Sequence, residues 1–388
     1  MERRQGKRTE KTRRYYDYSL LFIIIFLSCF GLIMIYSSSA YVAEMKFSDG
    51  SIHFLKRQAL ISAASFVVML VISKMNYHFF AKFAVLGYGA AVLCMILVNF
   101  TPLGIERNGQ KRWLGVSESL SFQPTELVKV AVILALACLI VLYVKRKKMD
   151  EWGTIFLMVF VTAVPGLLVL MNNLSSGIII LGIGFTMVFV ASRKKLRFAV
   201  VVGLGVVAVI AALQLGDKLV EMGVLESYQL DRIHVWRSPE SYPLEGGYQV
   251  LQGLYAIGSG GIFGKGLGNS IQKLSFVPEA QNDMIFSIIC EELGLFGAAC
   301  LILLFLFMIW RFMVIANNAP DLLGSMIVVG VMAHIAIQVI LNIAVITNTI
   351  PNTGITLPFI SYGGTSVLFL MVEMGMVLSV SNQIKIEK

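Results

Sequence analysis

Ten stretches of about twenty mostly apolar residues recur along this 388-residue sequence. An α-helix needs ~20 residues to cross the ~30 Å hydrocarbon core of a bilayer. The sequence therefore predicts a bundle of transmembrane helices. The expected spans are Leu20–Ala40, Ala59–Ser73, Phe79–Asn99, Leu127–Val144, Thr154–Met171, Leu174–Ser192, Phe198–Leu215, Met284–Trp310, Met326–Ile346 and Tyr362–Val380.

The composition supports the same fold class. Hydrophobic residues make up 57% of the chain and charged residues 14%, with a mean hydropathy of +0.78, whereas a soluble domain carries about 25% charged residues. We therefore predict an all-α, polytopic integral membrane protein. All five cysteines lie in apolar stretches without a metal-ligand spacing to a histidine, so no disulfide or zinc site is indicated.

The basic residues are distributed by side of the membrane. The net charge is +9, and short basic blocks flank the spans at residues 3–14, 145–148 and 193–197. This is the positive-inside pattern, not the basic face of a nucleic-acid-binding protein. An even number of spans then places both termini in the cytoplasm. We expect residues 1–17 to form a cytoplasmic basic tail and residues 18–384 to form one ten-helix membrane domain.

The longest loop is expected on the outer side. Residues 216–282, between the seventh and eighth spans, lack continuous hydrophobicity. Within them, residues 231–236 and 249–257 have the amphipathic pattern of short helices on the membrane surface. Because the outer loops are long and the inner ones short and basic, function is expected to face outward.

Three acids lie in the segment Phe276–Gly294. Asp283 stands where a polar loop meets a long apolar stretch, and Glu291 and Glu292 lie inside that stretch. An ionised carboxylate in hydrocarbon costs several kcal/mol or forces a pKa shift, so such acids usually have a partner or a function. On one helix, Asp283 and Glu291 would lie about 12 Å apart, too far for the paired acids of a glycosidase. We therefore expect Asp283 to act alone and the two glutamates to serve structure.

Charged residues also open the fourth span. Pro124 suits the first position of a helix, and Glu126 suits the positive end of its dipole. Glu126 and Lys129 are three residues apart and can pair on one face. Two interpretations stay open: a structural ion pair, or a polar pocket in which Lys129 meets an anionic ligand. Arg112, in the preceding basic loop, could likewise contact lipid headgroups or bind a phosphate or diphosphate.

Two further patterns favour structure over chemistry. The glycine-rich segment 258–268 follows no strand, so it is not a dinucleotide-binding motif. Close packing is favoured there over a nest of backbone amides that binds an anion. His334, Gln338 and Asn342 recur every four residues on the ninth span. Interhelical hydrogen bonds are favoured for them over a water-lined path.

Five segments together resemble the SEDS family (shape, elongation, division and sporulation), which includes FtsW, RodA and SpoVE. In family order they are RNGQKRWLG (107–115), FQPTELVK (122–129), GYQVLQGLYAIGSGGIFGKGLGNSIQK (247–273), VPEAQNDMIFSIICEELG (277–294) and IPNTGITLPFISYGGTS (350–366). Within the last of these, ITLPFISYGG is closer to the FtsW and SpoVE branch than to RodA.

The resemblance implies a peptidoglycan glycosyltransferase of the bacterial cytoplasmic membrane that polymerises lipid II at the outer face. Asp283 matches the family's catalytic carboxylate and would act as general base. It would deprotonate the 4-hydroxyl of the acceptor N-acetylglucosamine, which attacks the anomeric carbon of the donor glycan as undecaprenyl diphosphate leaves. The implied partners are a class B penicillin-binding protein, which is a transpeptidase, and other membrane proteins of division or elongation, but no nucleic acid.

The matched motifs also assign the remaining site residues. Arg112, Glu126 and Lys129 match positions that line the family's central cavity, and we assign them to substrate binding. The residues assigned to the structure of the pocket are Pro278, Glu279, Glu291, Glu292, Ser361, Gly363 and Gly364. No metal-ligand cluster is evident, and a divalent cation, Mg²⁺ or Mn²⁺, is the only cofactor considered.

The chain departs from the family pattern at two places. Family members usually read Pro-Asp-Leu-Gly-Thr after the fifth span, where this chain reads Asn172-Asn173-Leu174-Ser175-Ser176, and Asn348 stands where glycine is common. Two other functions remain open. A transporter that flips lipid II would use the same basic cavity, and a non-catalytic scaffold for division or sporulation would need only the helices. A carboxylate at the mouth of the cavity favours chemistry, whereas a polar path through the bilayer would favour transport.

Overall fold

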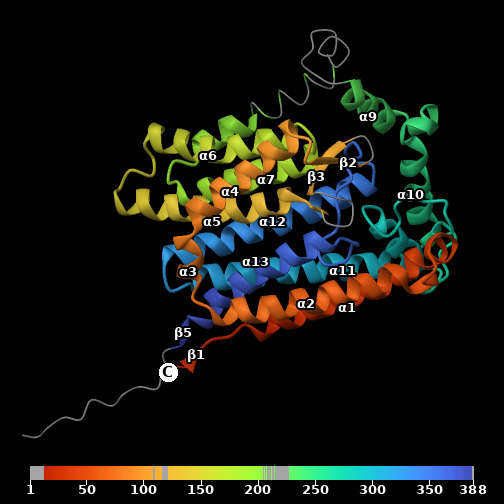
Figure 1. The fold of residues 1–388 in the computed structure, drawn as a ribbon, viewed down its shortest axis with the longest axis horizontal. Coiled ribbons are helices and arrows are strands. Elements are labelled where there is room, and N and C mark those ends of the chain that lie inside the picture. The colour runs from red at the N-terminus through yellow and green to blue at the C-terminus, as the bar shows by residue number, and fades with distance from the viewer. Residues whose placement is uncertain are drawn as a thin grey trace, which may run out of the picture.

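The computed structural model describes residues 13–107, 110–115, 121–203, 205, 207, 211, 214 and 227–386. In this part of the chain, long helices run side by side in one bundle (Figure 1). Eight of them are long and apolar enough to span a membrane. They are α1 (Tyr18–Lys46), α2 (His53–Lys74), α5 (Pro124–Lys145), α6 (Trp152–Leu170), α7 (Leu174–Ala191), α11 (Ile285–Asn317), α12 (Leu322–Ile346) and α13 (Gly364–Asn382).

The predicted helical membrane fold is confirmed, while the count of ten spans stays a prediction. The expected third span is two helices, α3 (Tyr77–Lys82) and α4 (Ala84–Phe100), with a break at Phe83. α4 is apolar but only 17 residues long. The expected seventh span, at residues 198–215, lies largely outside the described residues.

The connections gather at the two ends of the bundle (Figure 1). One end, here called the loop end, carries the strands β2 (Gly104–Arg107), β3 (Gln110–Gly115) and β4 (Ser121–Phe122), the helices α9 (Ser227–Arg237) and α10 (Gly247–Gly260), and the short 3₁₀ turns η1 (Gly50–Ile52), η2 (Pro239–Ser241) and η3 (Pro243–Glu245). Short helices form at both segments predicted within the long loop, as α9 and α10, but only α10 is amphipathic over its length.

The described residues begin and end at the opposite end of the bundle, here called the termini end. β1 (Arg13–Arg14) pairs antiparallel with β5 (Lys385–Ile386). Asp17 is fully buried there, and its backbone N–H donates to Ser381 Oγ over 2.9 Å. Its carboxylate pairs with Arg311 of α11, with 2.6 Å between Oδ2 and Nη2. Of the expected basic tail, residues 13–17 are described, and Asp17 among them is packed onto the bundle.

Short polar residues begin several helices by accepting otherwise unpaired backbone N–H groups. Asp17 accepts from Leu20 N at the start of α1, and Asp321 caps α12 in the same way. Asn173 caps α7 by accepting from Ser176 N over 3.1 Å. Asn173 departs from the family motif, but its side chain still caps the helix.

α12 lies at the centre of the bundle, where it contacts α5, α7, α11 and α13. Its polar stripe, predicted from the spacing of His334, Gln338 and Asn342, is buried on all three residues. Polar side chains at the centre of a membrane bundle need partners on neighbouring helices. The stripe thus fixes where polar contacts between helices can form.

α11 is broken at Gly294, whose backbone (φ 68°, ψ −169°) is open almost only to glycine. The break leaves carbonyl groups of α11 without partners in the helix. The C=O of Glu291 accepts from Lys265 N over 3.0 Å, and that of Glu292 accepts from Gly266 N over 2.9 Å. The chain after α10 thus replaces the missing turn of α11 and satisfies its backbone.

Close packing explains the glycine-rich segment after α10. A Cβ at Gly260 would lie 2.0 Å from the Cys290 carbonyl oxygen, and one at Gly264 would lie 2.2 Å from that of Glu292. The backbone N–H of Gly264 donates to Gly260 O. With the amides of residues 264–266 donating to backbone carbonyls, the alternative of an anion-binding nest is wrong for these positions.

Candidate active site

Asp283 lies two residues before α11, at the loop end of the bundle. Its carboxyl group is half-buried, and Oδ1 has no hydrogen-bond partner among the described residues. A Cβ added at Gly354 would lie 3.6 Å from Oδ2, so the connection between α12 and α13 passes beside the carboxyl group. A buried oxygen without a partner is costly.

Asn342 of α12 holds the backbone around Asp283. Its Nδ2 donates to the Asp283 carbonyl over 3.1 Å and to the Ile355 carbonyl over 2.6 Å. The backbone N–H of Tyr362 donates to Gln281 O over 2.9 Å. The start of α11 and the connection between α12 and α13 are therefore fixed to each other and to α12.

α9 and α10 hold this connection from the other side. Arg232 of α9 donates to the Asn352 carbonyl over 3.1 Å, and Trp236 donates to the Asn348 carbonyl over 2.9 Å. Asn352 in turn donates to Gln249 of α10 over 3.2 Å. The sequence did not single out Arg232, Trp236, Gln249 or Asn352. Their only signal was their position in the two segments predicted to be amphipathic and in the matched motif.

The surroundings of Asp283 change its acidity. Burial and the neighbouring Glu279 carboxylate raise the pKa of Asp283 from 3.8 to about 7, against smaller lowerings by its own backbone N–H, by the Gln249 side chain and by the Met284 backbone N–H. A carboxyl group with a pKa near 7 can both lose and accept a proton at neutral pH. Its geometry and acidity therefore suit a general base.

Glu126 and Lys129 form the expected ion pair at the start of α5. Lys129 Nζ lies 2.9 Å from Glu126 Oε2, and both side chains are buried. Lys129 also donates to Gln338 Oε1 over 3.4 Å. Gln338 lies one turn of α12, about 6 Å, from Asn342, which holds Asp283. Lys129 and Asp283 therefore contact neighbouring turns of α12, through Gln338 and Asn342. Substrate binding by Lys129 stays a prediction.

Arg112 lies on β3 and contacts the turn between α6 and α7. Its Nε donates to the Asn172 carbonyl over 2.9 Å. From the same turn, Ser175 Oγ donates to the Thr353 carbonyl over 2.7 Å, next to Gly354. The segment with the altered family motif thus lies between Arg112 and the connection that passes Asp283. Binding of a diphosphate by Arg112 stays a prediction.

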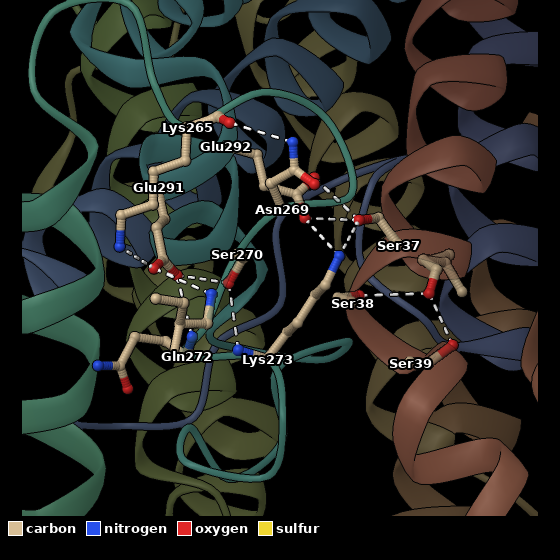
Figure 2. Close-up of polar contacts among 12 residues, drawn as sticks. Ser37, Ser38, Ser39, Lys265, Asn269, Ser270, Gln272, Lys273, Glu291 and Glu292 are labelled. Atoms are coloured by element: carbon tan, nitrogen blue, oxygen red, sulfur yellow. Dashed lines mark hydrogen bonds and ion pairs between the residues drawn. The ribbon is translucent and has the colours of Figure 1, made fainter.

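Glu291 and Glu292 are fully buried and point to opposite sides of α11 (Figure 2). Glu291 accepts from Lys265 Nζ over 2.7 Å and also from Ser270 Oγ. Glu292 Oε1 accepts from Lys273 Nζ over 2.8 Å and from Ser37 Oγ of α1 over 2.6 Å. The two acids therefore anchor the loop before Asp283 to α11 and α1. This agrees with the structural role expected for them.

The remaining pocket residues lie on the connections that flank Asp283. Ser361 Oγ accepts from Leu357 N over 2.7 Å. The Gly363 N–H donates to Gln58 of α2 over 3.3 Å, and Gly364 begins α13. Pro278 and Glu279 are exposed in the loop before α11. Their part in a substrate pocket stays a prediction.

One buried acid of the last span was missed in the sequence. Glu373 of α13 is fully buried, and its Oε2 lies 2.7 Å from His334 Nδ1. His334 Nε2 lies 2.8 Å from Gln338 Oε1. One chain of contacts therefore links α13, α12 and α5. The polar stripe on α12 was recognised, but spacing within one helix does not identify a partner on another.

Neither metal ligands nor large hollows identify the site. The described residues contain no group of three or more His, Cys, Asp and Glu side chains that could hold a metal ion, so assistance by a divalent cation stays a prediction. Two apolar hollows, of about 640 and 740 Å³, open between α6, α7 and residues 196–201 and between α4 and α6. Both lie away from Asp283, on faces that would meet lipid.

Comparison with known proteins gives consistent matches along the chain. Stage V sporulation protein E of Bacillus subtilis is 38% identical over 367 residues, covering 94% of this chain and 96% of that protein. The probable peptidoglycan glycosyltransferase FtsW of Trichlorobacter lovleyi is 33% identical over 371 residues, covering 96% and 94%. These relatives bear the names of the FtsW and SpoVE branch, which the segment ITLPFISYGG indicates.

Solved structures share the fold. A chain of a peptidoglycan synthase complex, studied for its coordination of polymerization and crosslinking, matches with a TM-score of 0.75 and 26% identity over 95% of this chain and 98% of that chain. The rod shape determining protein RodA of Thermus thermophilus matches with a TM-score of 0.68 over 95% and 97%; at 24% identity this likeness concerns the fold alone. The model of the cell cycle protein family FtsW/RodA/SpoVE matches residues 18–386, and the chain therefore belongs to this family.

Proposed function

We propose that this protein is a peptidoglycan glycosyltransferase that polymerises lipid II, with Asp283 as its general base. The observation that carries the proposal is the Asp283 carboxyl group: it is half-buried at the loop end, one oxygen lacks a partner, and its pKa is about 7. Relatives that align over nearly the whole chain are named as peptidoglycan glycosyltransferases. A poised base in such a chain supports glycosyl transfer.

Glycosyl transfer to the acceptor hydroxyl requires one general base, because the diphosphate leaves without needing an acid. Asp283 takes the proton from the 4-hydroxyl of the acceptor N-acetylglucosamine as that oxygen bonds to the anomeric carbon of the donor glycan. The bond from this carbon to the diphosphate breaks, and undecaprenyl diphosphate leaves with the electron pair. Lys129 and Arg112 would stabilise its charge, as fixed cations do for a charge that develops in a transition state. A divalent cation bound to the diphosphate would act in the same way.

The distribution of polar side chains along α12 and α13 favours glycosyl transfer over transport of lipid II through the bilayer. From His334, polar side chains continue along α12 toward the loop end through Gln338 and Asn342. Toward the termini end, residues 326–333 of α12 and 374–378 of α13 carry only apolar side chains and glycine. The described part of these helices thus offers a flipped diphosphate no polar path past His334.

The proposal includes a partner and a location. A structural neighbour of this chain is part of a peptidoglycan synthase complex, which supports a class B penicillin-binding protein as the partner that crosslinks the product. We place the chain in the bacterial cytoplasmic membrane with the loop end outside, because the basic blocks at residues 145–148 and 193–197 belong to the other side. Lipid II that has reached the outer leaflet would then meet Asp283.

The experiment is polymerisation of labelled lipid II by the chain purified in complex with its cognate class B penicillin-binding protein. Wild type should form glycan strands, and Asp283→Asn should lower the rate about 100-fold or more while retaining its folding and its partner. Asp231→Asn is the matched control, since it removes an exposed carboxylate of α9 at the same end. It should polymerise at the wild-type rate.

The other outcomes separate the alternatives. An Asp283→Asn variant that polymerises like wild type would eliminate Asp283 as the base. Wild type that forms no polymer but moves lipid II across vesicle membranes would establish a transporter. A complex that does neither, yet assembles with its partner, would be a scaffold.

A further inference from the structure

The buried chain of contacts at the centre of the bundle reaches the candidate site from within the membrane. Glu373 contacts His334, His334 contacts Gln338, and Gln338 contacts both Lys129 and Thr356. The Glu373, His334, Gln338 and Lys129 side chains are at most 3% exposed. The glycosyl transfer that we propose uses neither Glu373 nor His334 as a reacting group.

The contacts of Gln338 determine which way its amide group points. Its Nε2 lies 3.0 Å from the Thr356 carbonyl oxygen, which can only accept a hydrogen bond. Its Oε1 lies 3.4 Å from Lys129 Nζ, which can only donate. Both contacts require the same orientation. The oxygen of Gln338 therefore faces His334, and His334 Nε2 must carry a hydrogen to donate to it.

The same reasoning fixes one further proton. With Nε2 protonated, His334 Nδ1 faces Glu373 Oε2 over 2.7 Å. A bare ring nitrogen and an ionised carboxylate are both acceptors, so this contact requires a proton on one of them. The pair is then either an imidazolium beside a carboxylate or a neutral imidazole beside a carboxylic acid. Both states have no net charge.

A pair without net charge suits its position in the bundle. His334 lies twelve residues before the end of α12 at Ile346, which is about 18 Å from the loop end. A net charge at such depth in a bilayer is costly, whereas a paired and hydrogen-bonded group is tolerated. The pair can therefore hold Gln338 in one orientation from the buried centre of the bundle.

We propose that His334 and Glu373 are positioning residues for the active site. Through Gln338 they hold the Lys129 ammonium group and the Thr356 backbone, which follows Gly354 past Asp283. This inference rests on the proposed function for its effect on the reaction, but the proton arrangement it requires does not. Side chains that contact catalytic groups must restrict the motion of those groups, because displacement of a reacting group by about 1 Å can slow a reaction about 100-fold.

The test compares two replacements of Glu373 in the complex with the partner. Glu373→Leu leaves His334 Nδ1 without a partner, and we expect kcat for glycan polymerisation to fall about 10- to 100-fold with KM for lipid II changed less than about twofold. Glu373→Gln should return kcat to within about threefold of wild type, because an amide N–H donates to Nδ1 and preserves the hydrogen on Nε2. Thr162→Val is the control, since that buried hydroxyl donates to the Met158 carbonyl of its own helix, α6.

A second measurement is independent of polymerisation. The ¹⁵N nuclear magnetic resonance signals of the histidine side chains, with those of His334 identified by their loss in His334→Leu, report which ring nitrogen carries hydrogen. A protonated Nε2 in wild type and in Glu373→Gln supports the proposal. A bare Nε2 overturns it, as does an unchanged kcat in Glu373→Leu or a Gln variant as slow as the Leu variant. If wild type forms no polymer, the proposed function fails and the Nε2 signal alone decides this inference.

Discussion

At the scale of single residues, the acidity of Asp283 leads to a measurable pH dependence. The reaction needs the ionised carboxylate, and the pKa of Asp283 is raised to about 7. We expect kcat/KM for lipid II polymerisation to rise about tenfold per pH unit below pH 7 and to level off above it. The native state meanwhile loses stability as pH rises from about 3.8 to 7, because it retains a proton that the unfolded chain releases.

A neighbouring charge allows this prediction to be checked. The exposed Glu279 carboxylate contributes to the raised pKa of Asp283. Glu279→Gln should therefore move the acidic limb of the kcat/KM profile to lower pH. Glu240→Gln, which removes another exposed carboxylate of the loop end, should leave the limb in place. Two superimposable profiles would show that some other group controls the pH dependence.

The sequence identified residues by type and position but not by partner. Glu291 and Glu292 were expected to serve structure because acids in an apolar stretch need partners. Lys273 and Ser37 both donate hydrogen bonds to Glu292, yet they lie more than two hundred residues apart in the sequence. Glu373 carries the same signal, an acid inside the expected span Tyr362–Val380, but its partner His334 lies on a different helix and could not be predicted. Contacts between distant segments depend on how helices pack, and periodicity within one helix does not contain that information.

At the scale of elements, the break in α11 can be tested directly. Gly294 has a backbone conformation that other residues avoid, and a Cβ there would lie 2.3 Å from Gly264 N. Gly294→Ala should cost about 1–3 kcal/mol in backbone strain alone and lower the thermal unfolding midpoint in detergent. Gly89→Ala in α4 has open space around its Cβ and should be neutral or slightly stabilising. Equal midpoints for both variants would contradict this account of the break.

The anchor between α1, α11 and the loop before Asp283 gives a second test at this scale. Glu292→Leu would leave the buried Lys273 ammonium group without its carboxylate, which costs about 3–5 kcal/mol. Lys273→Met together with Glu292→Leu should recover much of that loss, because no unpaired charge then remains. Unfolding free energies of the two single variants and the double variant form the measurement. Additive losses would mean that the two groups do not act as a pair.

Element positions were more predictable than element ends. α5 and α7 occur where apolar stretches predict them, with Pro124 in the first turn as expected. The break at Phe83 between α3 and α4 was not predicted, because the apolar pattern runs through it. The strands β2–β4 were missed for a different reason: they are short, and only their pairing with one another stabilises them.

At the scale of the whole molecule, the two ends of the bundle differ in content. The buried pair of Asp17 and Arg311 and the pairing of β1 with β5 hold the first and last described residues at one end. Asp283, α9 and α10 lie at the other end. Apolar stretches and charge asymmetry were enough to predict this separation. Which end faces the cytoplasm depends on the positive-inside rule, and it determines whether Asp283 can reach lipid II at the outer face.

Two introduced cysteines test that orientation. Leu244, in η3 at the loop end, is 98% exposed, and Lys148 lies exposed in the connection between α5 and α6. In intact cells stripped of their wall, a membrane-impermeant maleimide should label Leu244→Cys, whereas Lys148→Cys should react only after lysis. The five natural cysteines lie within helices, so wild type measures the background. The reverse pattern would place Asp283 in the cytoplasm, where it could not extend glycan strands outside the membrane, and the proposed reaction would then fail on topology alone.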